Sequence, residues 1–194
     1  GHFFQTVDAL PLEPADVSLL IEAAQFDWSR VEPSIFGTLL VRALDPAERH
    51  RLGAEYTPRE YIERLVEPTV IEPLRERWTA VQAAVLQLTD LGDKKPGRVK
   101  KDREAAIKEL LGFHAWLRGL RFLDPACGSG NFLYVTMAAV KRIEHEVIRV
   151  LEDVRGKEQV EQVLEEVHPR QFHGIEVKRW AREIAGNFEY NRPL

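Results

Sequence analysis

The chain has 194 residues, of which 44% are hydrophobic and 30% are charged, and its net charge is −4. This length fits one domain with a helical addition, and the composition is ordinary for a globular protein. The acidic balance argues against a small, globally basic DNA-coating protein. One cysteine excludes an internal disulfide framework, and no apolar run approaches the roughly 20 residues that span a bilayer. We therefore expect a cytoplasmic protein without a membrane anchor.

The first part of the chain predicts helices that begin at prolines. Pro14 can occupy the first turn of a helix, and Pro33 can begin a second one. Asp45 followed by proline is typical of an N-cap and the first helical position of a third. The apolar residues expected to face inward on the first two helices are Val17, Leu20, Ile21, Ala24, Ile35, Phe36, Leu39, Leu40 and Leu44.

The same proline pattern continues toward the middle of the chain. Thr57 is an expected N-cap, and the helix that follows should end at Pro68, because proline breaks helix interiors. Pro73 should begin another helix that continues to about Leu88. The residues expected to form the core of these helices include Tyr61, Ile62, Leu65, Val66 and Trp78.

Residues 90–103 are polar and basic and contain Gly and Pro, so we expect an exposed loop there. A helix should follow from Glu104 to Arg118. The six cations of the loop are Lys94, Lys95, Arg98, Lys100, Lys101 and Arg103. These cations either belong to a solvated loop or contact DNA phosphates. Each phosphate contact would add affinity that does not depend on the DNA sequence.

The last part of the chain alternates strands and helices. Strands are expected at Leu120–Asp124 and Gln171–Val177, with a helix from Asn131 to Leu151 and on to Gly156. Shorter helices are expected at Glu158–Val167 and Trp180–Phe188. Two strands do not make a self-sufficient parallel sheet, which needs more strands and helices on both faces. We therefore expect the chain to be part of a larger fold, and its first residue, Gly1, is consistent with a boundary inside a longer polypeptide.

The segment Asp124–Phe132 reads DPACGSGNF and carries the strongest functional signal. An apolar strand ends on the carboxylate of Asp124, the chain turns through Gly128 and Gly130, and a helix begins at Asn131. Such a junction places free N–H groups and the positive end of a helix dipole beside an open space. In α/β proteins, nucleotide-like cofactors bind at this position, beyond the carboxyl ends of the strands.

With this string in view, the chain resembles DNA methyltransferases that modify adenine N6 or cytosine N4. Gly53–Pro58, which reads GAEYTP, is similar to the segment that caps the methionine end of the cofactor in this family. Phe172–Val177, which reads FHGIEV, is similar to the family's second strand with its acidic end. Residues 26–46 are similar to the preceding region of single-chain type IIG restriction–modification enzymes and related phage-defence methyltransferases.

The resemblance implies an α/β fold: a partial Rossmann-like core of two or so parallel strands behind a helical annex. The annex would be residues 1–118, with the capping segment at 53–60, and the truncated S-adenosylmethionine-binding domain would begin at residue 119 and continue to 194. The implied cofactor is S-adenosylmethionine, and DNA is the implied partner of the parent protein. The implied cofactor-binding residues are Tyr56, Thr57, Asp124, Pro125, Ala126, Gly128, Gly130, Asn131, Phe132, Glu176 and Val177.

Elementary chemistry agrees with these roles. Glycines let the backbone approach the cofactor closely, and Asp124 suits the cationic methionine portion. Glu176 can accept both ribose hydroxyls, and Val177 can pack on the adenine. Thr57, as an N-cap, would leave N–H groups free for a carboxylate. One departure is the spacing: Glu176 lies 52 positions after Asp124 (176 − 124), whereas the compact dinucleotide fold has about 20.

No catalytic residue is expected in this chain. The amino-methylating enzymes carry a later Pro-Pro-aromatic motif that holds the flipped target base, and no such sequence occurs here. We therefore expect the parent protein to be the active enzyme and this chain alone to be inactive. Cys127 is expected to be a turn residue, and neither His145 nor His173 has partners at metal-ligand spacing.

Two other functions remain open from the sequence. A nucleotide-dependent oxidoreductase is disfavoured because the third glycine of its fingerprint is absent and Asp-Pro-Ala-Cys precedes the turn. A non-catalytic module could keep a methyltransferase-like shell as a surface for assembly or DNA docking. Titration with S-adenosylmethionine and NAD distinguishes the first alternative, and loss of binding on replacement of Asp124 distinguishes the second.

Overall fold

The computed structural model describes residues 11–27, 57–90, 92, 95–155, 166–178, 181, 182 and 185. The chain divides into two compact units, Gly1–Tyr56 and Thr57–Leu194, which are described separately. The division at residues 118/119 stays a prediction.

In the first unit, helix α1 (Pro14–Ala24) begins at the predicted proline. Its predicted apolar stripe is exposed, and the helices predicted from Pro33 and Asp45 lie outside the described residues.

The second unit begins with one long helical run rather than two separated helices. Helix α4 (Arg59–Val66) continues through a π-helical turn, η3 (Glu67–Ile71), into helix α5 (Glu72–Thr89). The prediction that Pro68 ends the helix is therefore wrong. Proline removes one helical N–H, and the wider π turn lets the chain pass this residue without a break.

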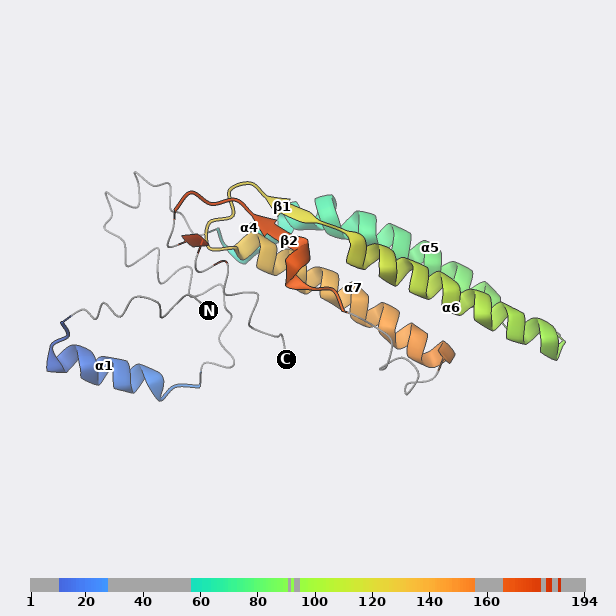
Figure 1. Ribbon diagram of the computed structural model, residues 1–194, viewed down its shortest axis with the longest axis horizontal. Coiled ribbons are helices and arrows are strands. Elements are labelled where there is room, and N and C mark those ends of the chain that lie inside the picture. Colours follow the sequence, from blue (N-terminus) through green and yellow to red (C-terminus); the bar gives the residue numbers. More distant parts are fainter. Residues whose placement is uncertain are drawn as a thin grey trace. The chain divides into compact units, whose positions relative to one another are not determined.

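The long helices α5, α6 (Pro96–Gly119) and α7 (Asn131–Arg155) form the body of this unit (Figure 1). Helix α6 packs against both α5 and α7. The predicted loop is thus wrong from residue 96 onward. Pro96 occupies the first turn, where its missing N–H costs nothing, and the lysines and arginines that follow are good helix formers.

Polar contacts show how the helices run. Arg103 of α6 donates to the carbonyl of Val154 on α7 at 2.7 Å, and Arg75 of α5 binds both carboxylate oxygens of Glu146 on α7 at 2.6 and 2.7 Å. Trp78 donates to the same carboxylate at 3.1 Å. Arg103 contacts Val154 and His114 contacts Glu144, so α6 is antiparallel to α7. Arg75 contacts Glu146, and Val85 lines a cavity with Val150 and Val154, so α5 is parallel to α7.

The core lies between these helices. Trp78 is buried as predicted and contacts Phe113, with ring centroids 5.1 Å apart. In α4, Ile62 is buried as predicted, whereas Tyr61 is exposed. Leu65 is also exposed, so only part of the predicted α4 face is correct. The remaining fully buried apolar side chains include Ala106, Leu110, Leu117, Val140, Ile143, Val147 and Leu151.

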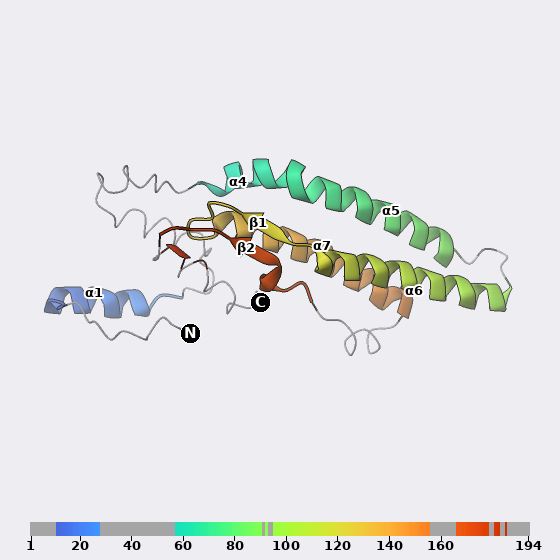
Figure 2. The same ribbon diagram turned by 45° about the horizontal axis from the view of Figure 1, so that its top comes forward.

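A two-stranded parallel sheet lies at the end of the bundle where α7 begins (Figure 2). Strand β1 (Phe122–Asp124) pairs with strand β2 (Phe172–Gly174), and Phe122 lies opposite Phe172 in the register. The two rings stack with centroids 4.8 Å apart. Both strands are shorter than predicted, and a 3₁₀ turn, η4 (Pro169–Gln171), precedes β2.

Other predictions fall at the edges of the described chain. Most of the helix predicted at Glu158–Val167 lies outside the described residues, and its last two residues are not helical. The helix predicted at Trp180–Phe188 is described only at residues 181, 182 and 185, which are helical. Within the described part of the chain, no helix is both long and apolar enough to cross a membrane.

A matched pair of leucines tests the helical core. Leu110 on α6 is fully buried, whereas Leu86 on α5 is 72% exposed. Leu110→Ala should lower the free energy of unfolding by about 2–5 kcal/mol, because it removes buried area and leaves a cavity. Leu86→Ala should change it by less than about 0.5 kcal/mol. Urea denaturation followed by circular dichroism measures both, and equal losses would contradict this packing.

Candidate functional site

The β1–α7 turn is held by backbone pairing that continues past the two strands. The amide of Ile175 donates to the carbonyl of Asp124 at 2.9 Å, and the amide of Cys127 donates to the carbonyl of Ile175 at 3.1 Å. The Oδ1 atom of Asp124 accepts a hydrogen bond from the amide of Ala126 at 3.0 Å. The start of the turn is therefore fixed both to β2 and to its own carboxylate.

The two glycines of the turn adopt conformations that other residues rarely take. Gly128 has φ +55° and Gly130 has φ +90°, so both lie in the left-handed region. The amide of Gly130 donates to the carbonyl of Cys127 at 2.8 Å, and its carbonyl accepts from Tyr134 at 2.9 Å as α7 begins. A Cβ at Gly128 would meet no atom within 4 Å. The backbone here faces open space beside the first N–H groups of α7, which have no partner within the helix.

Glu176 follows β2, and its side chain binds the backbone of the β1–α7 turn. One carboxylate oxygen accepts the amide of Gly128 at 3.0 Å, and the other accepts the amide of Lys178 at 2.7 Å. The structure thus brings the predicted residues Asp124, Gly128 and Glu176 together, although 52 positions (176 − 124) separate the two acids. Each carboxylate oxygen can accept a further hydrogen bond, so neither contact excludes a ligand hydroxyl.

Cys127 is a packed turn residue, as the sequence predicts. Its thiol is buried against Gly174, where an added Cβ would lie 2.9 Å from the Cβ of Cys127 and 3.1 Å from Leu133. Burial raises the pKa of the Cys127 thiol, and the charges of Asp124 and Glu176 raise it further. The thiol therefore stays protonated near neutral pH, which argues against a nucleophilic role.

The other predicted site residues are distributed around this turn. Pro125 and Ala126 are exposed, Asn131 is half-buried in the first turn of α7, and Val177 is 93% exposed. Phe132 packs against the edge of the core. Tyr56 lies outside the described residues.

The expected N-cap at Thr57 is wrong in detail. The N-cap position falls on Pro58, which has no side-chain cap, because helix α4 begins only at Arg59. Side chains of α4 and η3 line a cavity of about 580 Å³ together with Val135, Ala139 and Arg142 of α7. The first turns of α4 therefore lie beside those of α7. Thr57 comes just before α4 in the sequence.

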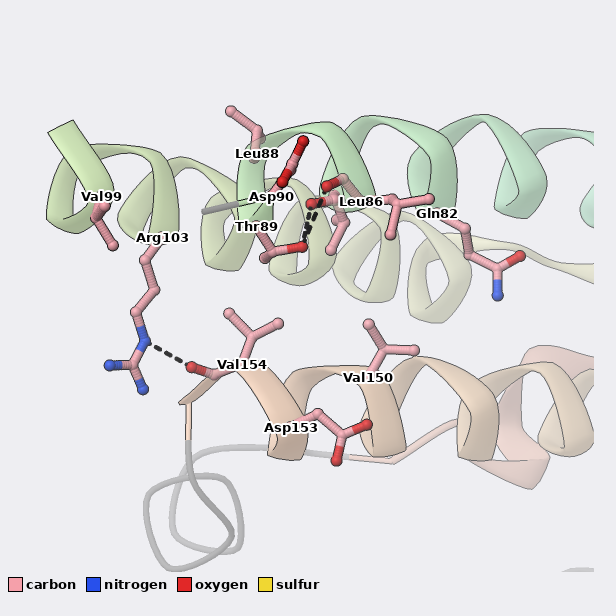
Figure 3. A pocket seen from close by; sticks show the side chains of 11 residues that line it. Gln82, Leu86, Leu88, Thr89, Asp90, Val99, Arg103, Val150, Asp153 and Val154 are labelled. Carbon is pink, nitrogen blue, oxygen red and sulfur yellow. Dashed lines mark hydrogen bonds between the residues drawn. The ribbon is translucent and has the colours of Figure 1, made fainter. Parts of the chain in front are cut away.

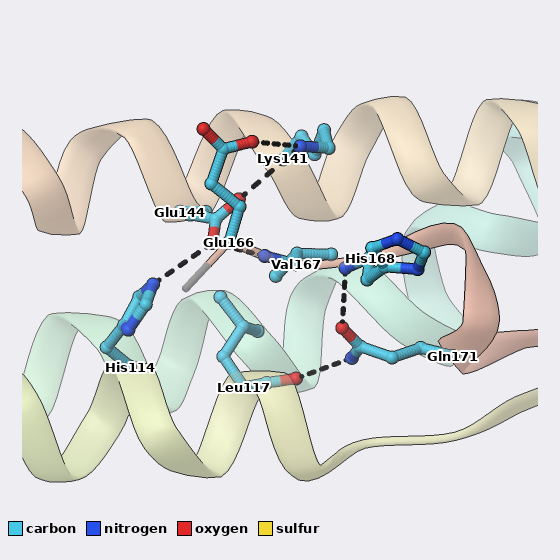
Figure 4. Close-up of polar contacts among 8 residues, drawn as sticks. All are labelled: His114, Leu117, Lys141, Glu144, Glu166, Val167, His168 and Gln171. Atoms are coloured by element: carbon cyan, nitrogen blue, oxygen red, sulfur yellow. Dashed lines mark hydrogen bonds and ion pairs between the residues drawn. The ribbon is translucent and has the colours of Figure 1, made fainter. Parts of the chain in front are cut away.

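The sequence interpretation missed a buried polar cluster next to the sheet, which comprises His114, Glu144 and Gln171 (Figure 4). The ring of His114 lies 3.0 Å from Glu144, and both side chains are almost fully buried. The sequence does contain a signal for this cluster. His114 interrupts the apolar pattern between Phe113 and Leu117, and Glu144 interrupts the pattern between Ile143 and Val147. A polar residue in such a stripe needs a partner.

A second cavity of about 580 Å³ lies at the opposite end of the bundle (Figure 3). Apolar side chains of α5 and α7, including Val85, Val150 and Val154, line it, and Arg103 and Asp153 stand at its rim. It shares no residue with the β1–α7 turn. Among the residues that the structure describes, no cluster of His, Cys, Asp or Glu could hold a metal ion.

Two glycine substitutions test the packing of the turn. Gly174→Ala should lower the free energy of unfolding by about 1–3 kcal/mol, because its methyl group would collide with Cys127. Gly112→Ala in α6 is the control: its Cβ would meet no atom within 4 Å, and alanine should stabilise the helix by about 0.5–1 kcal/mol. Thermal unfolding measures both, and a neutral Gly174→Ala would contradict the contact.

Comparisons with known proteins bear on this site. Residues 99–187 match the family model of the DNA-methyltransferase domain of MmeI. DNA methyltransferase A of Bacillus subtilis (strain 168) is 27% identical over 168 residues, which cover 86% of this chain and 16% of that relative. The type IIL restriction–modification enzyme MmeI, solved in complex with DNA, matches with a TM-score of 0.70 and 33% identity over 92% of this chain.

The chain spans 16% and 21% of the lengths of these two proteins. The matched range includes most of helix α6, the β1–α7 turn and strand β2. The resemblance to restriction–modification DNA methyltransferases is therefore confirmed, with residues 99–187 matching the DNA-methyltransferase domain of the MmeI family.

Proposed function

We propose that this chain is the S-adenosylmethionine-binding part of a site-specific DNA methyltransferase from a bacterial restriction–modification or phage-defence system. Adenine N6 is the favoured target over cytosine N4, and the parent resembles the single-chain type IIG class. The β1–α7 turn would be the start of a Rossmann-like core. The observation that carries the proposal is the glycine turn between two carboxylates, Asp124 and Glu176, at the start of α7.

The charges of the turn favour this cofactor over a dinucleotide. Burial raises the pKa of the Cys127 thiol, and the charges of Asp124 and Glu176 raise it further, so the two carboxylates add a negative potential at this turn. The methionine part of S-adenosylmethionine carries an ammonium and a sulfonium, which such a potential attracts. A dinucleotide would place its anionic pyrophosphate beside Asp124, which is unfavourable. This argues against the oxidoreductase alternative.

Individual residues have separate parts in the proposed binding. Asp124 would accept from the ammonium, and the backbone at Gly128 and Gly130 would let the cofactor approach closely. Glu176 would accept the ribose hydroxyls, and the exposed Val177 would pack on the adenine. The proposed contacts of Tyr56, Thr57, Pro125, Ala126, Asn131 and Phe132 complete the set.

When bound, the cofactor supplies a methyl group on its sulfonium. The residues of this chain would hold and orient that group, which contributes to rate by fixing the direction of approach. The chain contains no Pro-Pro-aromatic sequence, so we propose that it does not methylate DNA by itself. Since DNA would be the substrate, the cytoplasm is the proposed location.

Calorimetric titration tests the cofactor. The chain should bind S-adenosylmethionine and S-adenosylhomocysteine but not NAD. Asp124→Asn keeps an oxygen for the amide of Ala126 and removes the charge, so the affinity for S-adenosylmethionine should fall at least about ten-fold. Asp153→Asn, at the rim of the distant cavity, is the matched control and should leave the affinity unchanged.

Two outcomes would contradict the assignment. Tight binding of NAD without a response to either methionine-derived ligand would favour the oxidoreductase. Unchanged affinity in Asp124→Asn would favour a module that does not use this turn.

The basic residues near the start of α6 offer a contact for DNA phosphates. Arg98 is paired with Asp102 at 2.8 Å, and Arg103 donates to Val154, whereas Lys100 and Lys101 are exposed. These cations lie in the first two turns of a helix, where the dipole adds to their positive potential. Lys95 is also exposed, and Lys94 lies outside the described residues.

Salt dependence of DNA binding tests this surface in the full-length protein. The double variant Lys100→Ala, Lys101→Ala should weaken binding to DNA of any sequence and reduce the slope of log K against log salt by about 2, because two phosphate contacts are lost. Lys108→Ala, further along the same helix and also exposed, should leave the slope unchanged. An unchanged slope in the double variant would indicate a solvated helix end.

A further inference from the structure

The carboxylate of Glu144 joins three parts of the second unit (Figure 4). It projects from α7, is 1% exposed, and its Oε1 atom lies 3.0 Å from the Nε2 atom of His114 on α6. The same oxygen accepts the backbone amide of Val167 at 2.6 Å. Val167 precedes η4 and β2, so this bond fixes a non-helical segment to the bundle rather than one helix to another.

Lys141 adds a second link to the same segment. Its ammonium lies 3.9 Å from the other oxygen of Glu144 and 3.1 Å from the carboxylate of Glu166. Lys141 is largely buried, whereas Glu166 is exposed. The segment that leads into β2 is thus held by charged groups of α7 at two successive residues.

Gln171 holds the end of this segment to α6. Its side-chain nitrogen donates to the carbonyls of Leu117 and Leu120 at 3.1 and 3.2 Å, where α6 ends. Its side-chain oxygen accepts the amide of His168 at 2.9 Å. Gln171 is buried, and β2 begins at the next residue.

The position of β2 determines where Glu176 lies. The register places Asp124 opposite Gly174, Ile175 then pairs with Asp124 and Cys127, and Glu176 reaches the amide of Gly128. The strand has only three residues, so its own ladder provides few hydrogen bonds. An anchor just before Phe172 therefore adds to the few contacts that hold the register.

We propose that Glu144 and Gln171 are positioning residues for the cofactor site: they anchor residues 167–171 and thereby hold Glu176 against the glycine turn. This rests on the proposed S-adenosylmethionine site, and it adds residues of the buried polar cluster to it. A buried carboxylate contributes little net stability compared with an apolar pair. The buried carboxylate of Glu144 is therefore better explained by its role in holding residues 167–171 in place. The apolar core and the Arg75–Glu146 pair already hold the helices together.

A pair of glutamate variants on α7 separates positioning from general stability. Glu144→Gln keeps the shape of the side chain and one acceptor oxygen. It removes the negative charge of the acceptor and thereby weakens the hydrogen bond from the amide of Val167. Glu146→Gln is the control, because the carboxylate of Glu146 binds Arg75 and Trp78, which both belong to α5. Gln171→Leu is a second variant that removes both bonds to the end of α6.

The first measurement is hydrogen–deuterium exchange of the full-length protein without ligand. Glu144→Gln and Gln171→Leu should raise exchange in peptides covering residues 166–178 and leave α5 unchanged, whereas Glu146→Gln should leave 166–178 unchanged. The second is titration with S-adenosylmethionine, where Glu144→Gln should weaken affinity about ten-fold and Glu146→Gln less than two-fold.

Unchanged exchange at 166–178 in Glu144→Gln would overturn the positioning role, as would unchanged affinity despite raised exchange. Equal loss of affinity in Glu146→Gln would also overturn it, because bundle stability would then explain the effect. If the unsubstituted protein does not bind S-adenosylmethionine, the proposed function fails, and the exchange measurement alone decides whether Glu144 anchors β2.

Discussion

The site depends on the backbone pairing between Asp124 and Ile175 at the ends of two very short strands. This bond and its continuation at Cys127 place the carboxylates of Asp124 and Glu176 on the same turn. Asp124 and Glu176 are far apart in the sequence, and this pairing brings them to one site. Gly128 and Gly130 have left-handed φ angles, and the backbone at Gly128 faces open space between the two acids.

The helices supply the rigidity that two three-residue strands lack. Helix α7 begins directly at the turn, and its buried face packs on α6, so the turn is continuous with the core. Glu144 and Gln171 connect this core to the segment before β2. One consequence is that a substitution on α6 or α7 can act on the proposed cofactor site without touching it.

Much of the site could be predicted from the sequence because its signals are local. Gly128, Gly130 and Asp124 lie in one short string, and the helix after them has a clear apolar stripe. The continuation of the helix through Pro68 was not predicted, because the general rule that proline breaks a helix does not foresee a π turn at this residue. The buried pair of His114 and Glu144 was missed because each residue appears as an isolated polar position until the two helices are placed antiparallel.

The most direct test is the response of backbone amides to S-adenosylmethionine in a ¹⁵N-edited NMR titration of the chain. The amides of Gly128, Gly130 and Asn131 should shift with S-adenosylmethionine and not with NAD. Those of Val85 and Val150, beside the distant cavity, should not respond. Shifts at that cavity with none at the turn would contradict the assignment of the cofactor site.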